Sequence, residues 1–355
     1  MQRRSTTLVL FFTACGTSPS AGETSGGSTS STSAAADTSG GEGTSTTSSD
    51  PTTSGSTSGD TTSNAEGSST TGEEIELAGA CALDVHVGGF LAGYETSYSA
   101  FSGSVADGVV PLNVLEQVSE DGNCTLWRRN NPFCDPGCNA GETCDFDGNC
   151  LPYPANHEVG VVTVSGLATP VELEPVPPTY SYFDTMIPQP GFEPGAVITL
   201  RTTGGDYSPM LLHGIGVQMV VPTEDELYLD GSVPLEVEWA PGDAHATMRL
   251  QVAVDQHGVT PLAMICEAPA DAGSLTVSGA LITQFLANGI SGFPSADFYF
   301  ETIDSVDIEP GCVDFVVRSH DQLLVRVAGH TPCNVTAECP KGEICDVMNQ
   351  TCELP

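Results

Sequence analysis

Two short stretches with four cysteines each constrain the fold of this chain more than any other feature. The first, CDPGCNAGETCDFDGNC, spans residues 134–150, and the second, CNVTAECPKGEICDVMNQTC, spans residues 333–352. Both contain the pattern Gly-Glu-x-Cys-Asp. A unit of about twenty residues cannot bury a hydrophobic core of its own, so it needs cross-links, and two disulfides would each contribute about 2 to 4 kcal/mol. We therefore expect two small disulfide-bonded modules.

The first fifteen residues have the pattern of an export signal. Arg3 and Arg4 precede a short apolar run that cannot span a bilayer. The segment Phe-Thr-Ala-Cys at 12–15 resembles a bacterial lipobox, in which the cysteine thiol receives diacylglycerol and the chain is cut before it. We therefore predict a lipoprotein signal peptide at 1–14 and lipidation of Cys15, which would hold the protein on a membrane without a transmembrane helix. An ordinary cleaved signal peptide with an incidental cysteine is the alternative.

The segment that follows has the composition of a tether. Residues 16–75 are mostly Ser, Thr and Gly and contain no Lys or Arg. Such a chain behaves as a solvated coil, with an end-to-end distance of about 45 Å at this length. We predict a disordered tether that covers residues 15–75 together with the lipidated cysteine. In the lipoproteins that this segment resembles, a residue such as Gly16 permits sorting to the outer membrane, so we expect an exported protein of the outer membrane or cell surface.

The odd number of cysteines, 13, supports the assignment of one of them to a lipid. In an exported protein the remaining even set indicates a disulfide framework. Zinc is the alternative, but neither cluster has the paired CxxC or Cys/His spacing that zinc sites use. Outside the clusters, the intervals between cysteines lead us to expect the pairs Cys81–Cys124 and Cys266–Cys312. The twelve expected disulfide cysteines are Cys81, Cys124, Cys134, Cys138, Cys144, Cys150, Cys266, Cys312, Cys333, Cys339, Cys345 and Cys352.

The two clusters resemble the short cysteine-rich repeats of extracellular modules of the EB and Dickkopf kind. With the lipobox and the tether in front of them, they also resemble uncharacterised surface lipoproteins of the myxobacterial type. This resemblance implies an address and an architecture but no activity. Within each cluster we favour disulfides from the first to the third and from the second to the fourth cysteine, and the other two pairings stay open.

Alternating apolar and polar residues dominate residues 76–331. In one such segment, Leu235, Val237 and Trp239 alternate with two glutamates, and this period of two predicts half-buried strands. Segments of this kind are separated by Gly, Pro and Asp turn signals, and only residues 281–287 have the pattern of a short helix. We therefore predict an all-β fold of two antiparallel β-sandwich units, Ig-like or fibronectin-like in architecture.

The expected domain boundaries follow from the cysteines and the strands. The first sandwich unit covers residues 76–216 and contains the first cysteine-rich module as an insert at 133–152. The second unit covers residues 217–331, and the second cysteine-rich module forms the C-terminus at 332–355.

The charge of the chain excludes one class of partner and suggests another. With 46 Asp and Glu against nine Lys and Arg, the net charge is −37. So acidic a surface excludes general nucleic-acid binding, which depends on neutralising phosphates. Adaptation to salt is one interpretation, and cation binding is the other. Asp145, Asp147 and Asn149 alternate like the ligands in half of a calcium loop, although the glycine and distal glutamate of an EF-hand are out of place. We expect no cofactor, with calcium at these three residues as the exception.

The sequence contains no established catalytic pattern. The seven histidines are scattered, and neither HExxH nor a GxSxG before a helix occurs. We therefore expect a non-enzymatic surface lipoprotein, structural or adhesive, whose partners are the membrane and a surface protein or polysaccharide. The alternative is an exported hydrolase or metal-dependent enzyme with a site around His213, His245 and His257, where Asp255 and His257 would form part of a Ser-His-Asp arrangement. A third class is a protease inhibitor that displays residues 139–143.

Overall fold

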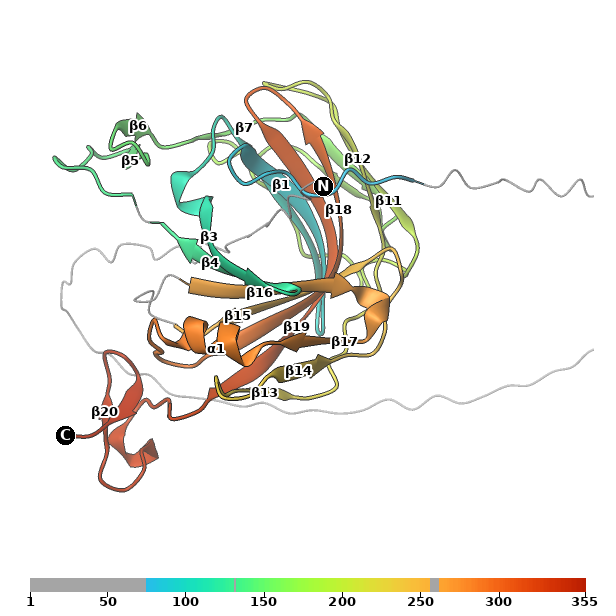
Figure 1. Ribbon diagram of the computed structural model, residues 1–355. Helices are drawn as coiled ribbons and strands as arrows, with labels where there is room; N and C mark the ends of the chain where they lie inside the picture. Colours follow the sequence, from blue (N-terminus) through green and yellow to red (C-terminus); the bar gives the residue numbers. More distant parts are fainter. Residues whose placement is uncertain (1–74, 131, 256–261) are drawn as a thin grey trace, which may run out of the picture. The chain divides into compact units, whose positions relative to one another are not determined.

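The computed structural model describes residues 75–130, 132–255 and 262–355, and these residues form mostly β-structure (Figure 1). The all-β prediction is confirmed. The predicted signal peptide, Cys15 and nearly all of the predicted tether lie outside the described residues, as does His257. Among the described residues, no helix combines the length and the apolar character that crossing a membrane requires.

The largest sheet has 11 strands, and its main path runs in the order β10-β2-β1-β19-β18-β15-β16-β4-β3. Neighbours on this path are antiparallel except β1, which runs parallel to β19. β13 also runs parallel to β19, and β7 pairs with β2. The strands are β10 (Tyr182–Asp184), β2 (Ser99–Ala106), β1 (His86–Glu95), β19 (Cys312–Val327), β18 (Ser295–Asp307), β15 (Thr247–Ala253), β16 (Leu262–Pro269), β4 (Cys124–Arg129), β3 (Leu115–Asp121), β13 (Glu226–Leu229) and β7 (Asn156–His157).

A second sheet of four strands packs on one face of the largest sheet. Its β12 contacts β18 and β19. Gly214 of β12 lies so close to β19 that an added Cβ would be 2.3 Å from Val317 Cγ2, so only glycine fits. The backbone N–H of Ile215 donates to Thr302 Oγ1 at 3.1 Å, which satisfies a polar side chain inside the contact. The four strands, in spatial order, are β12 (Leu211–Ile215), β11 (Val197–Thr202), β8 (Val162–Ser165) and β9 (Val171–Leu173).

The hydrophobic core includes residues of both sheets and follows from the alternation in the sequence. Met248 and Leu250 of β15, Phe298 of β18 and Phe315 of β19 are all fully buried, as is Leu200 of β11. Each buried side chain of this size stabilises the fold by about 1.5 to 3 kcal/mol relative to exposure. Residues of both expected sandwich units belong to this one cluster.

The expected boundary between residues 216 and 217 does not separate two sheets. β1 to β4 precede it, β15, β16, β18 and β19 follow it, and all of them share the largest sheet. Figure 1 shows β1 beside the long strands β18 and β19, which lie near the other end of the colour scale. Turn signals and alternation reveal strands, but the pairing of strands far apart in sequence is set by the core.

Short elements complete the described part. The helix α1 (Gly279–Leu286) begins two residues before the predicted segment because Ser278 Oγ accepts the N–H of Leu281 at 3.2 Å and caps its first turn. The helix buries Leu281 and Phe285 against the core. The other short elements are β14 (Leu235–Glu238), β17 (Ser274–Val277) and the 3₁₀ turns η1 (Pro111–Asn113), η2 (Ala270–Ala272) and η3 (Thr336–Glu338).

Both cysteine clusters fold as two-stranded hairpins. In the first module, β5 (Glu142–Cys144) pairs with β6 (Cys150–Pro152), and in the second, β20 (Ile344–Asp346) pairs with β21 (Thr351–Glu353). The favoured first-to-third and second-to-fourth pairing is confirmed in both. The bonds are Cys134–Cys144, Cys138–Cys150, Cys333–Cys345 and Cys339–Cys352.

The expected pairing of the other four cysteines is wrong. The structure joins Cys81 to Cys312 and Cys124 to Cys266, across 231 and 142 residues of sequence. The reason is the order of the strands, because Cys124 of β4 and Cys266 of β16 are direct partners in neighbouring strands. Cys81 lies just before β1, which pairs with the strand that Cys312 begins. Nearness in sequence therefore did not predict nearness in the sheet.

Candidate functional site

The face of the largest sheet opposite the core carries an unusual number of charged side chains. Alternation along β15 buries Met248 and Leu250 in the core and places Arg249 on the other face. The strand register sets Arg249 opposite both Glu267 and Tyr299, and it sets Glu301 opposite Arg318. We call this surface the charged face and define it by Glu95, Arg249, Glu267, Asp297, Tyr299, Glu301, Arg318 and His320.

Arg249 is the centre of the first cluster on the charged face. Its side chain is only 2% exposed, its Nη1 donates to Glu301 Oε1 at 2.9 Å, and its Nη2 lies 3.6 Å from Glu267 Oε1. Glu301 is 5% exposed and Glu267 is 24% exposed. Burial raises the pKa of Glu267, and nearby Glu301 adds to this effect while Arg249 opposes it. A buried arginine needs these carboxylates, since an unpaired buried charge is strongly destabilising.

A cavity of about 350 Å³ adjoins this cluster. The Nε and Nη2 nitrogens of Arg249 are buried and donate no hydrogen bond among the described residues. Arg249 does not line the cavity, which instead offers the carboxylate acceptors of Glu267 and Glu301 and the hydroxyl of Thr247. These groups can pair with the hydroxyl groups of a ligand, because each hydroxyl both donates and accepts. Its volume lies at the lower end of the range of small-ligand sites. Its lining consists of residues 77–80, His245, Thr247, Glu267, Glu301, Thr302 and Ile303.

His320 is the centre of the second cluster. Its Nδ1 hydrogen-bonds with Glu95 Oε2, and its Nε2 lies 3.0 Å from Asp297 Oδ1. Its ring stacks on Tyr299 with centroids 4.9 Å apart, and the Arg318 guanidinium lies 4.6 Å from the centre of the same tyrosine ring. Burial alone would lower the pKa of His320, but the bonds to Asp297 and Glu95 raise it to about 9. At neutral pH the imidazole is therefore charged and donates from both nitrogens, so it serves as a structural cation.

The segment before β1 is fixed to the sheet by one covalent and two polar contacts. Cys81 forms its disulfide with Cys312 and donates its N–H to Asp314 Oδ1 at 2.7 Å. Ala78 donates its N–H to Asp304 Oδ1 at 2.9 Å. Asp314 is fully buried, and burial raises the pKa of its carboxyl to about 7. We call these five residues the N-terminal clamp.

The three residues predicted to hold calcium lie in one turn of the first module. Asp145 Oδ1 accepts the N–H groups of Asp147 at 3.0 Å and of Asn149 at 2.7 Å, and Asn149 Nδ2 donates to Asp145 Oδ2 at 3.2 Å. The backbone hydrogen bond from Asn149 is the main cause that lowers the pKa of Asp145. These contacts give Asp145 a role in shaping the turn, and calcium binding here stays a prediction.

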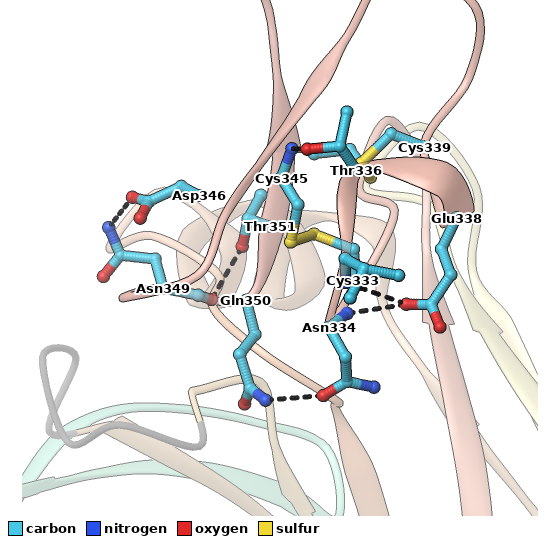
Figure 2. Close-up of a disulfide and its surroundings, with 12 residues drawn as sticks. Cys333, Asn334, Thr336, Glu338, Cys339, Cys345, Asp346, Asn349, Gln350 and Thr351 are labelled. Atoms are coloured by element: carbon cyan, nitrogen blue, oxygen red, sulfur yellow. Dashed lines mark hydrogen bonds between the residues drawn. A yellow bond between two sulfur atoms is a disulfide. The ribbon is translucent and has the colours of Figure 1, made fainter.

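The second module repeats this turn (Figure 2). Asp346 Oδ1 accepts the N–H of Met348 at 2.9 Å, and Asn349 Nδ2 donates to Asp346 Oδ2 at 2.7 Å. The aspartate of the shared Gly-Glu-x-Cys-Asp pattern thus has the same structural use in both modules. In the first module, Glu142 Oε2 also accepts the backbone N–H and the side-chain amide of Asn139, each at 3.0 Å, within the segment considered as an inhibitor loop.

The histidines predicted for an enzyme site occupy different places. His245 lines the cavity, whereas His213 lies in β12 and donates its backbone N–H to Asp304 Oδ2 at 2.8 Å. Asp255 accepts a hydrogen bond from Ser291 Oγ. Because His257 lies outside the described residues, the predicted Asp255–His257 arrangement stays a prediction.

Sequence reasoning missed the residues that form the charged face. Alternation with Met248 and Leu250 assigns Arg249 to the polar side of its strand, but nothing in the pattern shows that this side is buried. A faint signal existed, since Arg249 and Arg318 are two of only nine basic residues and each lies within a strand pattern. The partners on the charged face are far apart in sequence: Arg249 and Glu301 are separated by 52 residues, and His320 and Glu95 by 225.

The fold and the site together define an all-β body, cross-linked by disulfides, with a partly buried charged face. No family model matches the chain, and no curated protein matches it. Six disulfides are typical of proteins that fold in an oxidising compartment.

Solved structures give weak likenesses. The FN1–FN3 domains of chicken CNTN1 are 10% identical, with 64% of this chain and 78% of that chain covered and a TM-score of 0.20. A 1.5-MDa bacterial ice-binding adhesin is 10% identical over 71% of this chain and 69% of that chain, with a TM-score of 0.16. A Ca²⁺-stabilised adhesin of an Antarctic bacterium is 11% identical over 72% and 79%, also with a TM-score of 0.16.

Proposed function

We propose that the protein is an exported, lipid-anchored surface protein with a structural or adhesive, non-enzymatic role. The observation that carries this proposal is the cysteine pairing. The six disulfides use all twelve cysteines from Cys81 to Cys352, so the sequence holds no further cysteine with which Cys15 could pair. A thiol at the end of an export signal, followed by a Ser/Thr/Gly-rich tether, is the arrangement that lipid anchoring requires.

Metabolic labelling tests the anchor. Cells that express the wild type with radioactive palmitate should yield a labelled protein in the membrane fraction, and Cys15→Ala should yield neither label nor membrane attachment. Ser18→Ala is the matched control, because it changes a nearby small residue without touching the thiol. Equal labelling of Cys15→Ala and the wild type would contradict the anchor.

The cavity beside Arg249 supports a polysaccharide as the ligand of an adhesive role. The carboxylates of Glu267 and Glu301 offer acceptors and the Thr247 hydroxyl offers a donor to sugar hydroxyls, and the net charge of −37 makes a polyanion a poor ligand. A glycan array probed with purified protein should give binding that weakens in Thr247→Val, which removes a hydroxyl from the lining. Thr276→Val, outside the lining, should keep the binding. An array without signal would contradict a glycan ligand while leaving the lipid anchor intact.

One observation favours the alternative of an exported hydrolase. Glu267, with its raised pKa, and Glu301 line the same cavity, and glycoside hydrolysis uses a pair of carboxylates in which one has a raised pKa. Both carboxylates are, however, paired with Arg249, which leaves neither free to act as a nucleophile. A panel of glycoside substrates decides between the two functions. Turnover that disappears in Glu267→Gln would replace the adhesive proposal by the enzymatic one.

Calcium at the first module is tested by calorimetric titration. Binding to the wild type that is lost in Asp145→Asn would support the predicted site. Equal heats for the two proteins, or no heat for the wild type, would reject it.

A further inference from the structure

The Cys81–Cys312 disulfide joins the segment that follows the predicted tether to the first residue of β19. We propose that this disulfide carries mechanical tension around the body, so that a pull between the tether and the C-terminal module leaves residues 82–311 folded and inextensible. The proposal rests on the proposed function for the origin of the load, since a tethered adhesive protein is pulled between its anchor and its ligand.

The force path follows from the connectivity. A pull on the N-terminal side reaches Cys81, crosses the disulfide to Cys312 and continues along β19 towards the C-terminal module. The two cysteines are 231 residues apart in sequence, so all residues between them lie in a closed loop outside this path. Fully extended, that loop would measure about 80 nm, and the disulfide withholds this length from extension.

The part of the path inside the body is already extended. β19 (Cys312–Val327) is a single strand of 16 residues, and a strand rises about 3.3 Å per residue, close to the maximum reach of a chain. Tension between its two ends therefore gains little length. β19 is also held on one side by β18 and on the other by β1, which keeps it in place under load.

Both ends of the path are short. Before the disulfide, only residues 75–80 of the described part can peel away, and this breaks the hydrogen bond from Ala78 to Asp304. After β19, residues 328–332 lead to the second module, whose bonds Cys333–Cys345 and Cys339–Cys352 close it again. A backbone hydrogen bond of 2.8 Å from Gly292 N–H to Asn349 O also holds this module to the body.

A second disulfide lies within the loop that Cys81–Cys312 closes. Cys124–Cys266 closes a loop across 142 residues and joins directly paired strands within the larger loop. If the Cys81–Cys312 disulfide were lost, the Cys124–Cys266 disulfide would still prevent the chain between Cys124 and Cys266 from extending. The remaining parts of the outer loop, residues 82–123 and 267–311, would then become extensible, which corresponds to about 30 nm of chain.

Single-molecule force spectroscopy tests this order. Residues 16–355 are held by peptide handles placed before residue 16 and after Pro355, so that only the twelve disulfide cysteines are present. Under oxidising conditions the wild type should lengthen by less than about 10 nm once the extension of residues 16–74 is subtracted. The double variant Cys81→Ser/Cys312→Ser should release about 30 nm, and the control Cys339→Ser/Cys352→Ser should keep the body locked as in the wild type.

Reduction under load gives the same test without any variant that could misfold. A reductant added to the stretched wild type should release the 30 nm step and then the remainder, to a total of about 80 nm. A wild type that extends by 30 nm or more before reduction would overturn the proposal, as would one that stays short after it. Because the assay uses no lipid, its result is independent of the palmitate experiment that tests the anchor.

Discussion

Replacing Asp314 by asparagine gives a quantitative test of the N-terminal clamp. Asparagine keeps the shape of the side chain and can still accept the N–H of Cys81, but it does not ionise. Burial raises the pKa of Asp314 to about 7, against 3.8 in an exposed chain. The folded state therefore holds a proton that the unfolded state releases between these two values.

The sign of the effect follows from this difference. The stabilisation that Asp314 contributes is complete below pH 3.8 and is lost as the pH rises to about 7, because charging the buried carboxylate costs free energy. At about 1.4 kcal/mol per pH unit, the full range corresponds to about 4 kcal/mol, and the part between pH 5 and pH 8 to about 2 to 3 kcal/mol. Asp314→Asn should therefore gain stability relative to the wild type by that amount between pH 5 and pH 8.

Urea unfolding of both proteins at several pH values measures this difference. His86 lies 3.4 Å from Asp314, and burial lowers the pKa of that histidine, so its own contribution is present above about pH 6.5 and is lost as the pH falls below that value. Repeating the comparison in a His86→Gln background removes this opposite effect. A free-energy difference between wild type and Asp314→Asn that does not change from pH 5 to pH 8 would refute the assignment of a buried, protonated carboxyl to the clamp.

Three further predictions concern the core cross-link and the charged face. The double variant Cys124→Ala/Cys266→Ala should lose about 5 kcal/mol of unfolding free energy in denaturant titration, because the disulfide that it removes closes a long loop. A loss under about 1 kcal/mol would contradict a stabilising role of this disulfide. Glu301→Gln should cost about 3 to 5 kcal/mol because it leaves Arg249 with a weaker buried partner, whereas an unchanged melting temperature would show that the pair is dispensable. The pKa of His320 is raised to about 9, so the stability that this histidine contributes should be complete below pH 6.5 and lost as the pH rises through 9. A His320→Gln variant whose unfolding free energy has the wild-type pH profile in that window would contradict this.

Local patterns in the sequence predicted the local structure well. The alternation of Met248, Arg249 and Leu250 correctly predicts a strand with one apolar face, because burial on one side of a sheet requires a period of two. The spacing in the clusters likewise indicates small disulfide-bonded modules, and the favoured pairing of first with third and second with fourth cysteine is confirmed. These features depend on residues close together in sequence.

What the sequence could not supply is the pairing of distant strands. β1 pairs with β19 more than 200 residues later, and no pattern within either strand specifies that partner or its register. The predicted pairing of Cys81, Cys124, Cys266 and Cys312 is wrong for this reason. The charged face was missed for the same reason, since Glu95 and His320 meet only after that pairing brings them together.

The Cys81–Cys312 disulfide ties the beginning of the described part to its last long strand. Peptide mapping by mass spectrometry of the non-reduced, exported protein tests it most directly. We predict that the peptide with Cys81 is linked to the peptide with Cys312, and that the peptide with Cys124 is linked to the peptide with Cys266. Links from Cys81 to Cys124 and from Cys266 to Cys312, or free thiols at these four positions, would contradict the account.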